Sequence, residues 1–218
     1  MARTSSQSEW QAALDALRAE EKELMRASDA LAAKRRRLPR LAVSKNYRFR
    51  TPTGEVSLED LFQGRHQLIV YHHMLKPSDP APCAGCSMVG DQIAHLAHLN
   101  ARDTSFTMVS QAPIDEIEAF RKRMGWDIPW SESLDDFSPD HDVTTGFGVN
   151  VFLRENGQIW RTYFTTGRGV ETLGPVWSLL DITAYGRQES WQDAPDGVPQ
   201  SAPYQWWRLH DNYQPEAQ

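Results

Sequence analysis

Both cysteines of the chain stand in one short stretch, Cys83-Ala84-Gly85-Cys86. This stretch follows a predicted buried strand over 67–74 and a proline-rich loop over 76–82, and it begins a predicted helix that reaches about Ala101. Two residues between cysteines at a helix start let the sulfurs meet without breaking the helix. A dithiol at this junction of strand and helix constrains the fold of the whole chain.

The elements around the dithiol alternate between strands and helices. In chain order the sequence predicts a short hairpin that begins at Tyr47 and turns at 51–54, and a short amphipathic segment over 56–62. After the dithiol helix it predicts a strand over 106–109, a helix over 113–124, an irregular stretch over 126–148, a hairpin over 149–153 and 159–164, and a helix over 175–181. Asn156-Gly157 is a strong turn signal in the second hairpin. This order predicts an α/β fold, a thioredoxin-like three-layer sandwich with an N-terminal helical extension and a long aromatic C-terminal tail.

The predicted boundaries give an N-terminal helical extension over 1–46, a thioredoxin-like domain over 47–190, and an aromatic tail over 191–218 that packs on the domain. The extension is a helix over 8 to about 37, ended by Pro39. It carries a narrow stripe of leucines: Leu14, Leu17, Leu24 and Leu31. We expect this helix to pack across the domain or against a second copy of the chain, which would make a homodimer.

Charge and composition exclude several classes of protein. The formal net charge is −6, so no nucleic-acid partner is expected, and we interpret Lys34-Arg35-Arg36-Arg37 as a helix C-terminus favoured by the helix dipole. The longest apolar run, Leu68-Ile69-Val70-Tyr71, is too short to cross a membrane. With no signal peptide and only two cysteines, the expected compartment is the cytoplasm.

The first cysteine is expected to attack and the second to resolve. Free N–H groups and the positive end of the helix dipole stabilise a thiolate at Cys83, which attacks a disulfide or another sulfur or oxygen electrophile. Cys86, one turn further on and less exposed, then resolves the mixed species. The predicted activity is a thiol-dependent dithiol–disulfide oxidation or reduction that needs no cofactor and draws on an external thiol reductant. The alternative, that the two cysteines are only small buried apolar residues, conflicts with the tight turn that Pro82 and Gly85 favour.

A metal-binding protein on the same fold is the main alternative. Copper or zinc would be held by Cys83, Cys86 and a nearby histidine, and His72 and His73 end the strand that leads to the cysteine loop. Adjacent strand residues point to opposite faces, so at most one of these histidines faces the cysteines. A further set of side chains on one helical face is interpreted as solvated: Asp91, His95 and His98.

Four side chains are assigned to substrate binding: His73, Trp130, His141 and Arg168. His141 stands in the long loop, where it would place an acid–base group over the dithiol, although plain loop polarity explains it equally. Arg168 follows the second hairpin and would hold an anionic substrate or pair with the acidic surface. In a third interpretation, the long loop and the C-terminal tryptophans form the apolar pocket of a non-enzymatic binding module.

Several separated blocks occur in one order along the chain: Tyr71-His72-His73-Met74, Cys83-Ala84-Gly85-Cys86-Ser87, Leu99-Asn100-Ala101-Arg102-Asp103, Arg123-Met124-Gly125-Trp126 with Pro129-Trp130, Thr162-Tyr163, Arg168-Gly169, Leu180-Asp181, Gly186-Arg187 and Trp207-Arg208-Leu209-His210-Asp211-Asn212-Tyr213. Together they resemble the bacterial thioredoxin-like family known as domain of unknown function 899. The resemblance covers roughly 47–213. It implies a thioredoxin-like fold and a dithiol–disulfide activity, without a defined substrate.

Two places depart from the expected patterns. Ser138-Pro139-Asp140-His141 stands where a more aromatic segment is expected, and Gly146-Phe147-Gly148 stands where thioredoxins carry a cis-proline facing the dithiol. That proline presents backbone to a bound peptide, so its absence points away from a general protein-disulfide reductase. The proline also keeps the thiols from capturing a metal, so its absence favours the metal alternative. A dedicated peroxidase is disfavoured, since Pro80 precedes Cys83 without the Pro-x-x-x-Thr-x-x-Cys pattern. Small-molecule, peroxide and protein disulfide substrates all stay open.

Overall fold

The computed structural model describes residues 4–213 and divides the chain into two compact units, 1–39 and 40–218. The ends of the predicted extension and of the predicted tail, residues 1–3 and 214–218, lie outside the described residues.

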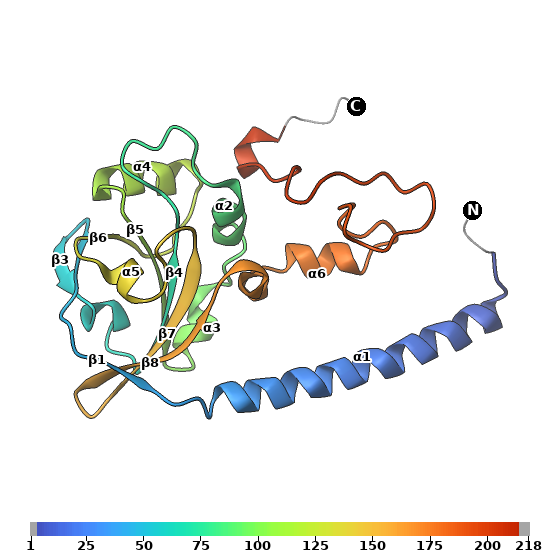
Figure 1. Ribbon diagram of the computed structural model, residues 1–218, viewed down its shortest axis with the longest axis horizontal. Coiled ribbons are helices and arrows are strands. Elements are labelled where there is room, and N and C mark those ends of the chain that lie inside the picture. Colours follow the sequence, from blue (N-terminus) through green and yellow to red (C-terminus); the bar gives the residue numbers. More distant parts are fainter. Residues whose placement is uncertain (1–3, 214–218) are drawn as a thin grey trace. The chain divides into compact units, whose positions relative to one another are not determined.

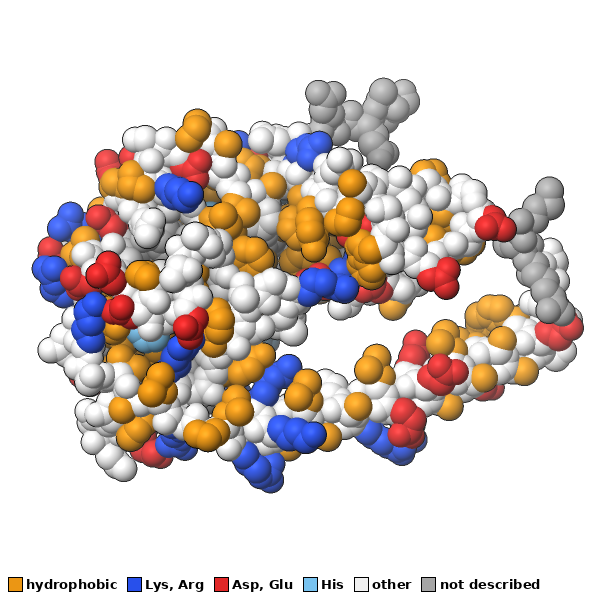
Figure 2. Space-filling model, viewed as in Figure 1, with side chains coloured by type: hydrophobic (Ala, Val, Ile, Leu, Met, Phe, Trp, Pro, Cys, Tyr) orange, Lys and Arg blue, Asp and Glu red, His pale blue; other side chains and the backbone are white. Residues whose placement is uncertain are grey.

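The first unit is the single helix α1 (Gln7–Arg35), as the sequence predicts. A capping box starts it: the Ser6 backbone N–H donates to Glu9 Oε2 at 2.8 Å, and the Glu9 N–H donates to Ser6 Oγ at 3.3 Å. Lys34 and Arg35 occupy its last turn, where the helix dipole favours positive charge. No residue of α1 is buried, and hydrophobic side chains stand exposed between charged ones along it (Figure 2).

The second unit is built on one eight-stranded sheet with the order β1-β8-β7-β4-β5-β6-β2-β3. The strands are β1 (Leu41–Val43), β2 (Arg48–Thr51), β3 (Gly54–Ser57), β4 (Gln67–His72), β5 (Thr104–Ser110), β6 (Trp130–Ser133), β7 (Gly148–Glu155) and β8 (Gln158–Thr165). The helices are α2 (Ala84–Gly90), α3 (Leu96–Asn100), α4 (Ile114–Arg123), α5 (Phe137–Asp140) and α6 (Val176–Asp181), with short 3-10 helices η1 (Asp60–Phe62), η2 (Gly167–Leu173) and η3 (His210–Asn212).

The neighbouring strands β8, β7, β4 and β5, with the helices packed on them, make the predicted thioredoxin-like fold (Figure 1). β4 pairs in parallel with β5 on one side and antiparallel with β7 on the other, and β8 continues antiparallel from β7. The dithiol helix α2 follows β4, which lies between β5 and β7 in the sheet. Helices α2, α3, α4 and α6 pack on one face of the sheet, and η1 and α5 pack on the other, which gives three layers.

Side chains of β4 alternate between two hydrophobic cores. Tyr71 and the partly buried Ile69 belong to the core beneath the dithiol helix, whereas Leu68 and Val70 belong to the core beneath η1 and α5. This alternation decides which strand residues reach the cysteines.

Both predicted hairpins are confirmed. β2 and β3 pair from Arg48↔Ser57 to Thr51↔Gly54. β7 and β8 are joined by Asn156 (φ 53°) and Gly157 (φ 75°), the two positive φ values that a type I′ turn requires. In addition β1, from the segment assigned to the extension, pairs antiparallel with β8.

The helix predicted from Cys83 to Ala101 is wrong in its length, because the chain forms two short helices, α2 and α3, instead. The His95 side chain accepts the Ala97 backbone N–H at 3.2 Å and so caps a new helix start. The break follows Gly90, where a β-carbon would lie 2.7 Å from the Trp126 ring, so helix and indole meet closely there.

Asp91, His95 and His98 consequently do not share one helical face. The Asp91 carboxylate accepts the Trp126 indole N–H at 2.8 Å and pairs with His210 Nδ1 at 2.7 Å. Asp91 therefore fixes the end of α2 against two other segments of the domain.

The stretch 126–148, predicted to be irregular, contains β6 and α5. β6 extends the sheet by pairing with β5 at Met108↔Trp130. Trp130 and Ser131 are both buried, so this strand lacks the alternation of polar and apolar residues that marks a strand in a sequence. Within residues 4–213, no helix has the length and apolar character needed to cross a membrane.

Candidate active site

Cys83 and Cys86 occupy the start of α2. Cys83 is the N-cap residue, and the Cys86 backbone N–H donates to the Cys83 sulfur at 3.3 Å. Ser87 anchors the same turn, since its backbone N–H and its hydroxyl both donate to the Cys83 carbonyl, at 3.0 and 2.9 Å. Both thiols are free; Cys83 is partly exposed, whereas Cys86 is only 1% exposed.

The two thiols have opposite electrostatic environments. The Cys86 thiol donates to the Cys83 sulfur and, against the opposing effect of burial, this contact and the backbone N–H groups of Cys86 and Gly85 lower the pKa of Cys83 to about 6. The same contact, together with burial, raises the pKa of Cys86 above its usual range. At neutral pH the arrangement holds a thiolate at Cys83 and a thiol at Cys86.

The strand residue that reaches the dithiol is Tyr71, which the sequence analysis does not single out. Its hydroxyl lies beside Cys86, and burial together with the negative charge of the dithiol raises the pKa of Tyr71 well above its usual value. Tyr71 therefore keeps its proton. The alternation of side chains along a strand could have indicated it. Tyr71 stands two residues before His73, so the two side chains lie on the same face of the strand, and Tyr71 is the one further from the cysteine loop in the sequence.

A cavity of about 370 Å³ opens beside Cys83. It is lined by Tyr71, Cys83, Gly85, Val89, Phe147, Gly167, Arg168, Val170, Glu171, Trp177, Tyr204 and Trp207. Most of the wall is aromatic or aliphatic, and its two charged side chains, Arg168 and Glu171, pair with each other at 3.1 Å. Phe147, directly before β7, belongs to the segment where the sequence analysis expects the cis-proline of a thioredoxin.

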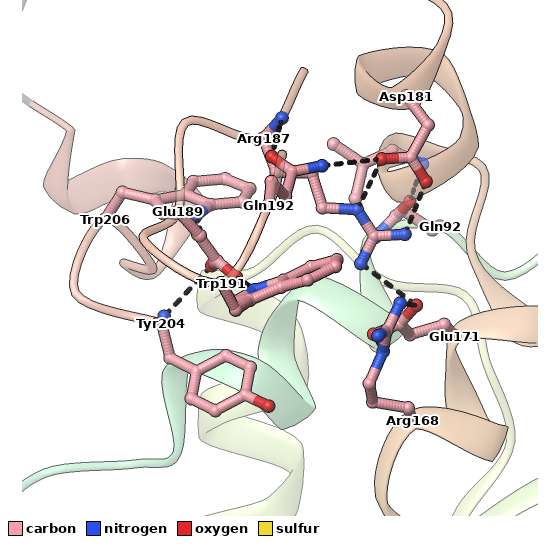
Figure 3. Close-up of polar contacts among 11 residues, drawn as sticks. Gln92, Arg168, Glu171, Asp181, Arg187, Glu189, Trp191, Gln192, Tyr204 and Trp206 are labelled. Carbon is pink, nitrogen blue, oxygen red and sulfur yellow. Dashed lines mark hydrogen bonds and ion pairs between the residues drawn. The ribbon is translucent and has the colours of Figure 1, made fainter. Parts of the chain in front are cut away.

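The cavity is closed on one side by the C-terminal segment, which a buried carboxylate holds in place. Glu189 is 2% exposed and accepts hydrogen bonds from Trp191 Nε1 at 2.5 Å, Trp206 Nε1 at 2.8 Å and the Tyr204 backbone N–H at 3.0 Å (Figure 3). Burial alone would raise the pKa of Glu189, but these donors and Arg187 outweigh it and lower the pKa. The segment thereby brings Tyr204 and Trp207 to the cavity wall.

A second buried charge joins this segment to the cavity rim. The Arg187 guanidinium donates to both oxygens of Asp181, at 2.8 and 2.6 Å, and to Glu171 at 3.0 Å (Figure 3). Arg168 donates to the other oxygen of Glu171 and lies over the Trp191 ring, 4.5 Å from its centroid. These ion pairs link Arg168 and Glu171, at the rim of the cavity, to Arg187 and Asp181, and so hold the rim in place.

Of the four predicted substrate-binding residues, only Arg168 lines the cavity. His73 shares the face of Tyr71 but is buried against Trp130, with ring centroids 4.6 Å apart, and its Nδ1 accepts the Leu75 backbone N–H at 3.1 Å. Burial lowers the pKa of His73 to about 3, so it provides no positive charge for the dithiol. Trp130 donates its indole N–H to Ser110 and is part of the same core.

His141 lies on the opposite face of the sheet from the dithiol. Its Nδ1 donates to the Phe137 carbonyl at 2.7 Å, and its ring packs against Tyr47 and Phe152, with centroids 5.3 and 5.1 Å away. Burial outweighs the neighbouring carboxylates and lowers its pKa. The structure therefore does not place His141 over the dithiol.

His72 belongs to a polar network on that opposite face. It contacts Ser138 Oγ through Nδ1 at 2.9 Å, and Asn150 Nδ2 donates to its Nε2 at 3.0 Å. Asn150 also donates to the His141 carbonyl at 3.0 Å and accepts from Arg161 Nε at 2.6 Å. With His72 facing away and His73 enclosed by aromatic rings, neither joins the cysteines, and residues 4–213 hold no group of three His, Cys, Asp or Glu side chains suited to a metal ion.

A family model described as "Bacterial protein of unknown function (DUF899)" matches residues 1–213. No curated protein matches the chain. Similar solved structures are a hypothetical protein from Sinorhizobium meliloti 1021 (11% identity, 59% of this chain and 71% of that chain, TM-score 0.46), a PrxQ mutant from Xylella fastidiosa (15%, 62% and 89%, 0.42), and the bacterioferritin comigratory protein of Xanthomonas campestris (14%, 61% and 94%, 0.41).

Proposed function

The chain belongs to the bacterial family of unknown function DUF899, and we propose that it is a dithiol–disulfide oxidoreductase in which Cys83 attacks and Cys86 resolves. The asymmetry of the two thiols supports this assignment most directly. Cys83 is partly exposed at a helix start with a lowered pKa, and Cys86 is buried one turn later with a raised pKa.

The reaction with a disulfide substrate has two exchange steps. The Cys83 thiolate forms a bond to one substrate sulfur, the substrate S–S bond breaks, and the departing thiolate takes a proton. Cys86 then loses its proton and bonds to the Cys83 sulfur, which releases the second substrate thiolate and leaves a Cys83–Cys86 disulfide. An external thiol restores the dithiol by the reverse chemistry.

The roles of the chain's own residues follow from their positions. The Cys86 thiol and the backbone N–H groups of α2 hold the negative charge of Cys83 before attack. The protonated Tyr71 beside Cys86 keeps a donor next to the resolving sulfur as charge moves onto it. The cavity beside Cys83 is where the part of the substrate that carries the attacked atom is held.

Single serine variants test the assignment. Cys86→Ser, treated with a low-molecular-weight disulfide, should retain a stable mixed disulfide on Cys83 in intact-mass measurements, because attack proceeds and resolution does not. Cys83→Ser should react at pH 7 roughly a hundredfold more slowly, since the remaining thiol of Cys86 is buried, which limits access and disfavours its thiolate. Equal reactivity of the two variants would contradict the assignment of the attacking and resolving roles.

A further inference from the structure

The C-terminal segment covers part of the turn that carries the dithiol. Trp207 lies against Gly85, the residue between the cysteines, so closely that a β-carbon on Gly85 would stand 2.5 Å from the indole. Tyr204 packs on this indole, with ring centroids 4.6 Å apart. A protein that brings a disulfide to Cys83 has to place its own chain beside the dithiol turn, where the indole already lies. A small molecule needs only the cavity.

The cavity beside Cys83 offers apolar walls to such a molecule. Three aromatic residues of the lining are not buried and are therefore open to a bound molecule: Phe147, Tyr204 and Trp207. The volume of about 370 Å³ lies at the small end of the range for ligand sites. Apolar surface is stabilised by burial against such walls, whereas a polar group loses its water there without a replacement. The cavity therefore suits a compact molecule with an apolar body.

The charged groups at the rim of the cavity balance one another. Apart from the dithiol, Arg168 and Glu171 are the only charged residues in the described lining, and they pair at 3.1 Å. Behind them Arg187 pairs with both Glu171 and Asp181 (Figure 3). Two guanidinium groups are thus matched by two carboxylates, and neither sign of charge is left over for a charged substrate. We therefore expect the bound molecule to be uncharged.

We propose that the dithiol reacts with low-molecular-weight disulfides whose substituents are uncharged and apolar, and that the cavity lined by Phe147, Tyr204 and Trp207 binds one of these substituents. The reacting bond is that of the dithiol function proposed above, on which this inference rests, and the cavity selects the substituent R. The Cys83 thiolate bonds to one sulfur of R–S–S–R, the S–S bond breaks, and the departing R–S⁻ takes a proton. Cys86 then loses its proton and bonds to the Cys83 sulfur, which releases the second R–S⁻ and leaves the Cys83–Cys86 disulfide.

A matched pair of disulfides tests this substrate class. Dipropyl disulfide and bis(2-hydroxyethyl) disulfide differ only in a terminal methyl or hydroxyl group on chains of equal length. The reduced full-length chain is mixed with an excess of each disulfide below saturation, and the loss of free thiols is followed by alkylation and intact mass. Each rate is divided by the rate of N-acetylcysteine with the same disulfide, which removes the intrinsic reactivity of the S–S bond. The normalised rate with dipropyl disulfide should be at least about tenfold higher.

Charged and protein disulfides complete the series. Cystamine replaces the terminal methyl groups by ammonium groups, and dithiodiglycolate carries carboxylates, so both should have lower normalised rates than dipropyl disulfide. Insulin should have the lowest normalised rate, because Trp207 covers part of the dithiol turn.

Variants of the lining locate the selection. Phe147→Ala removes part of the apolar wall and should reduce the preference for dipropyl over bis(2-hydroxyethyl) disulfide roughly fivefold. Phe164→Ala is the matched control, because Phe164 pairs with Asn150 in the sheet and so lies on the face away from the dithiol, and it should keep the full preference. Trp207→Ala should reduce the preference and also raise the normalised rate with insulin, since it uncovers the dithiol turn.

The outcomes separate this inference from the proposed function. Equal normalised rates for the matched pair, or a faster rate with either charged disulfide or with insulin than with dipropyl disulfide, would overturn the apolar substrate class and leave the dithiol function intact. An unchanged preference in both Phe147→Ala and Trp207→Ala would overturn the assignment to this cavity. Failure of every disulfide to oxidise the chain would remove the dithiol function itself.

Discussion

Trp207 lies so close to Gly85 that a β-carbon at position 85 would stand 2.5 Å from Cζ3 and 2.7 Å from Cε3 of the indole. The residue between the two cysteines is therefore matched to a tryptophan from the C-terminal segment. This contact joins the segment to the dithiol turn and closes one wall of the cavity.

Gly85→Ala should displace Trp207 from the dithiol turn. The added methyl group cannot be accommodated without movement of the ring, so we expect a loss of about 1–3 kcal/mol in the free energy of unfolding. Tryptophan fluorescence should shift, and proteases should cut the C-terminal segment sooner than in the wild type.

Trp207→Leu supplies the control for this prediction. In a Trp207→Leu background the smaller side chain leaves room for the methyl group. Gly85→Ala should therefore lower the free energy of unfolding clearly less there than in the wild type. Equal costs in both backgrounds would show that the alanine acts through the backbone of α2 rather than through the indole.

The alkylation rate of Cys83 should rise with pH through a midpoint near 6, the pKa that its surroundings set. Cys86→Ala removes the largest contributor to the lowered pKa and should move the midpoint above about pH 7. Asp79→Asn should move it the other way, because the Asp79 charge raises the pKa of Cys83. Iodoacetamide labelling of Cys83 across a pH series measures all three, and a wild-type midpoint near 9 would contradict the prediction.

Local signals in the sequence are sufficient for the framework of the fold. Cys83-x-x-Cys86 after a buried strand, the Asn156-Gly157 turn and the Pro39 stop of the first helix each depend on chemistry within a few positions of one another. For that reason the dithiol turn, both hairpins and the first helix are where the sequence predicts them.

The rest of the site depends on contacts between distant segments, which no local pattern encodes. Tyr71 meets Cys86 across the strand–helix layer, and Trp207 reaches Gly85 from the far end of the chain. Conversely, the residue types of the histidine pair and the loop histidine suit a redox site, but His73 packs among aromatic rings and His141 lies on the opposite face of the sheet. Spacing alone does not distinguish these outcomes.

Glu189→Gln should destabilise the C-terminal segment. The amide lacks the negative charge that strengthens three hydrogen bonds from the segment. We therefore expect the free energy of unfolding to fall by about 2–3 kcal/mol. Glu155→Gln is the control, because Glu155 forms an exposed ion pair with Arg40 and such pairs contribute little. Chemical denaturation followed by tryptophan fluorescence compares the two, and similar losses in both would contradict the anchoring role of Glu189.

The lowered pKa of Glu189 also predicts in which direction the stability of the protein changes in acid. Because folding lowers the pKa of Glu189 from its usual 4.5, its contribution is complete above about pH 4.5 and is lost as the pH falls through the lower folded-state value. The wild type should therefore lose stability in this acid range more steeply than Glu189→Gln. Parallel stability–pH curves for the two proteins would rule out the contribution.

Asn150→Ala should lower the free energy of unfolding by about 2–4 kcal/mol, because it leaves buried polar groups without their hydrogen-bond partner. Truncation of an exposed amide would lower it less. Asn150 is fully buried and joins His72, the His141 carbonyl and Arg161. Cys83 alkylation should be unchanged, since this network lies on the other face of the sheet from the dithiol. A matching loss of thiol reactivity would show that the two faces are coupled.

The last prediction concerns α1, whose apolar residues repeat with the spacing of a coiled coil. Trp10, Leu17, Leu24 and Leu31 follow one another at seven-residue intervals, and Leu24 is 72% exposed. A seven-residue apolar repeat buries its stripe against a second helix of the same kind. We propose that α1 pairs with α1 of a second copy of the chain.

Leu24→Glu should therefore convert a dimer into a monomer in sedimentation velocity, as should deletion of residues 1–38, while Cys83 alkylation is unchanged in both. Lys22→Glu introduces the same side chain two positions away, outside the apolar stripe, and should leave the dimer intact. Because the intervening stripe position at Glu21 is charged, the pairing is expected to be weak and to depend on protein concentration. A wild-type chain that sediments as a monomer at every concentration, or a dimer that survives loss of the helix, would show that α1 does not form the interface.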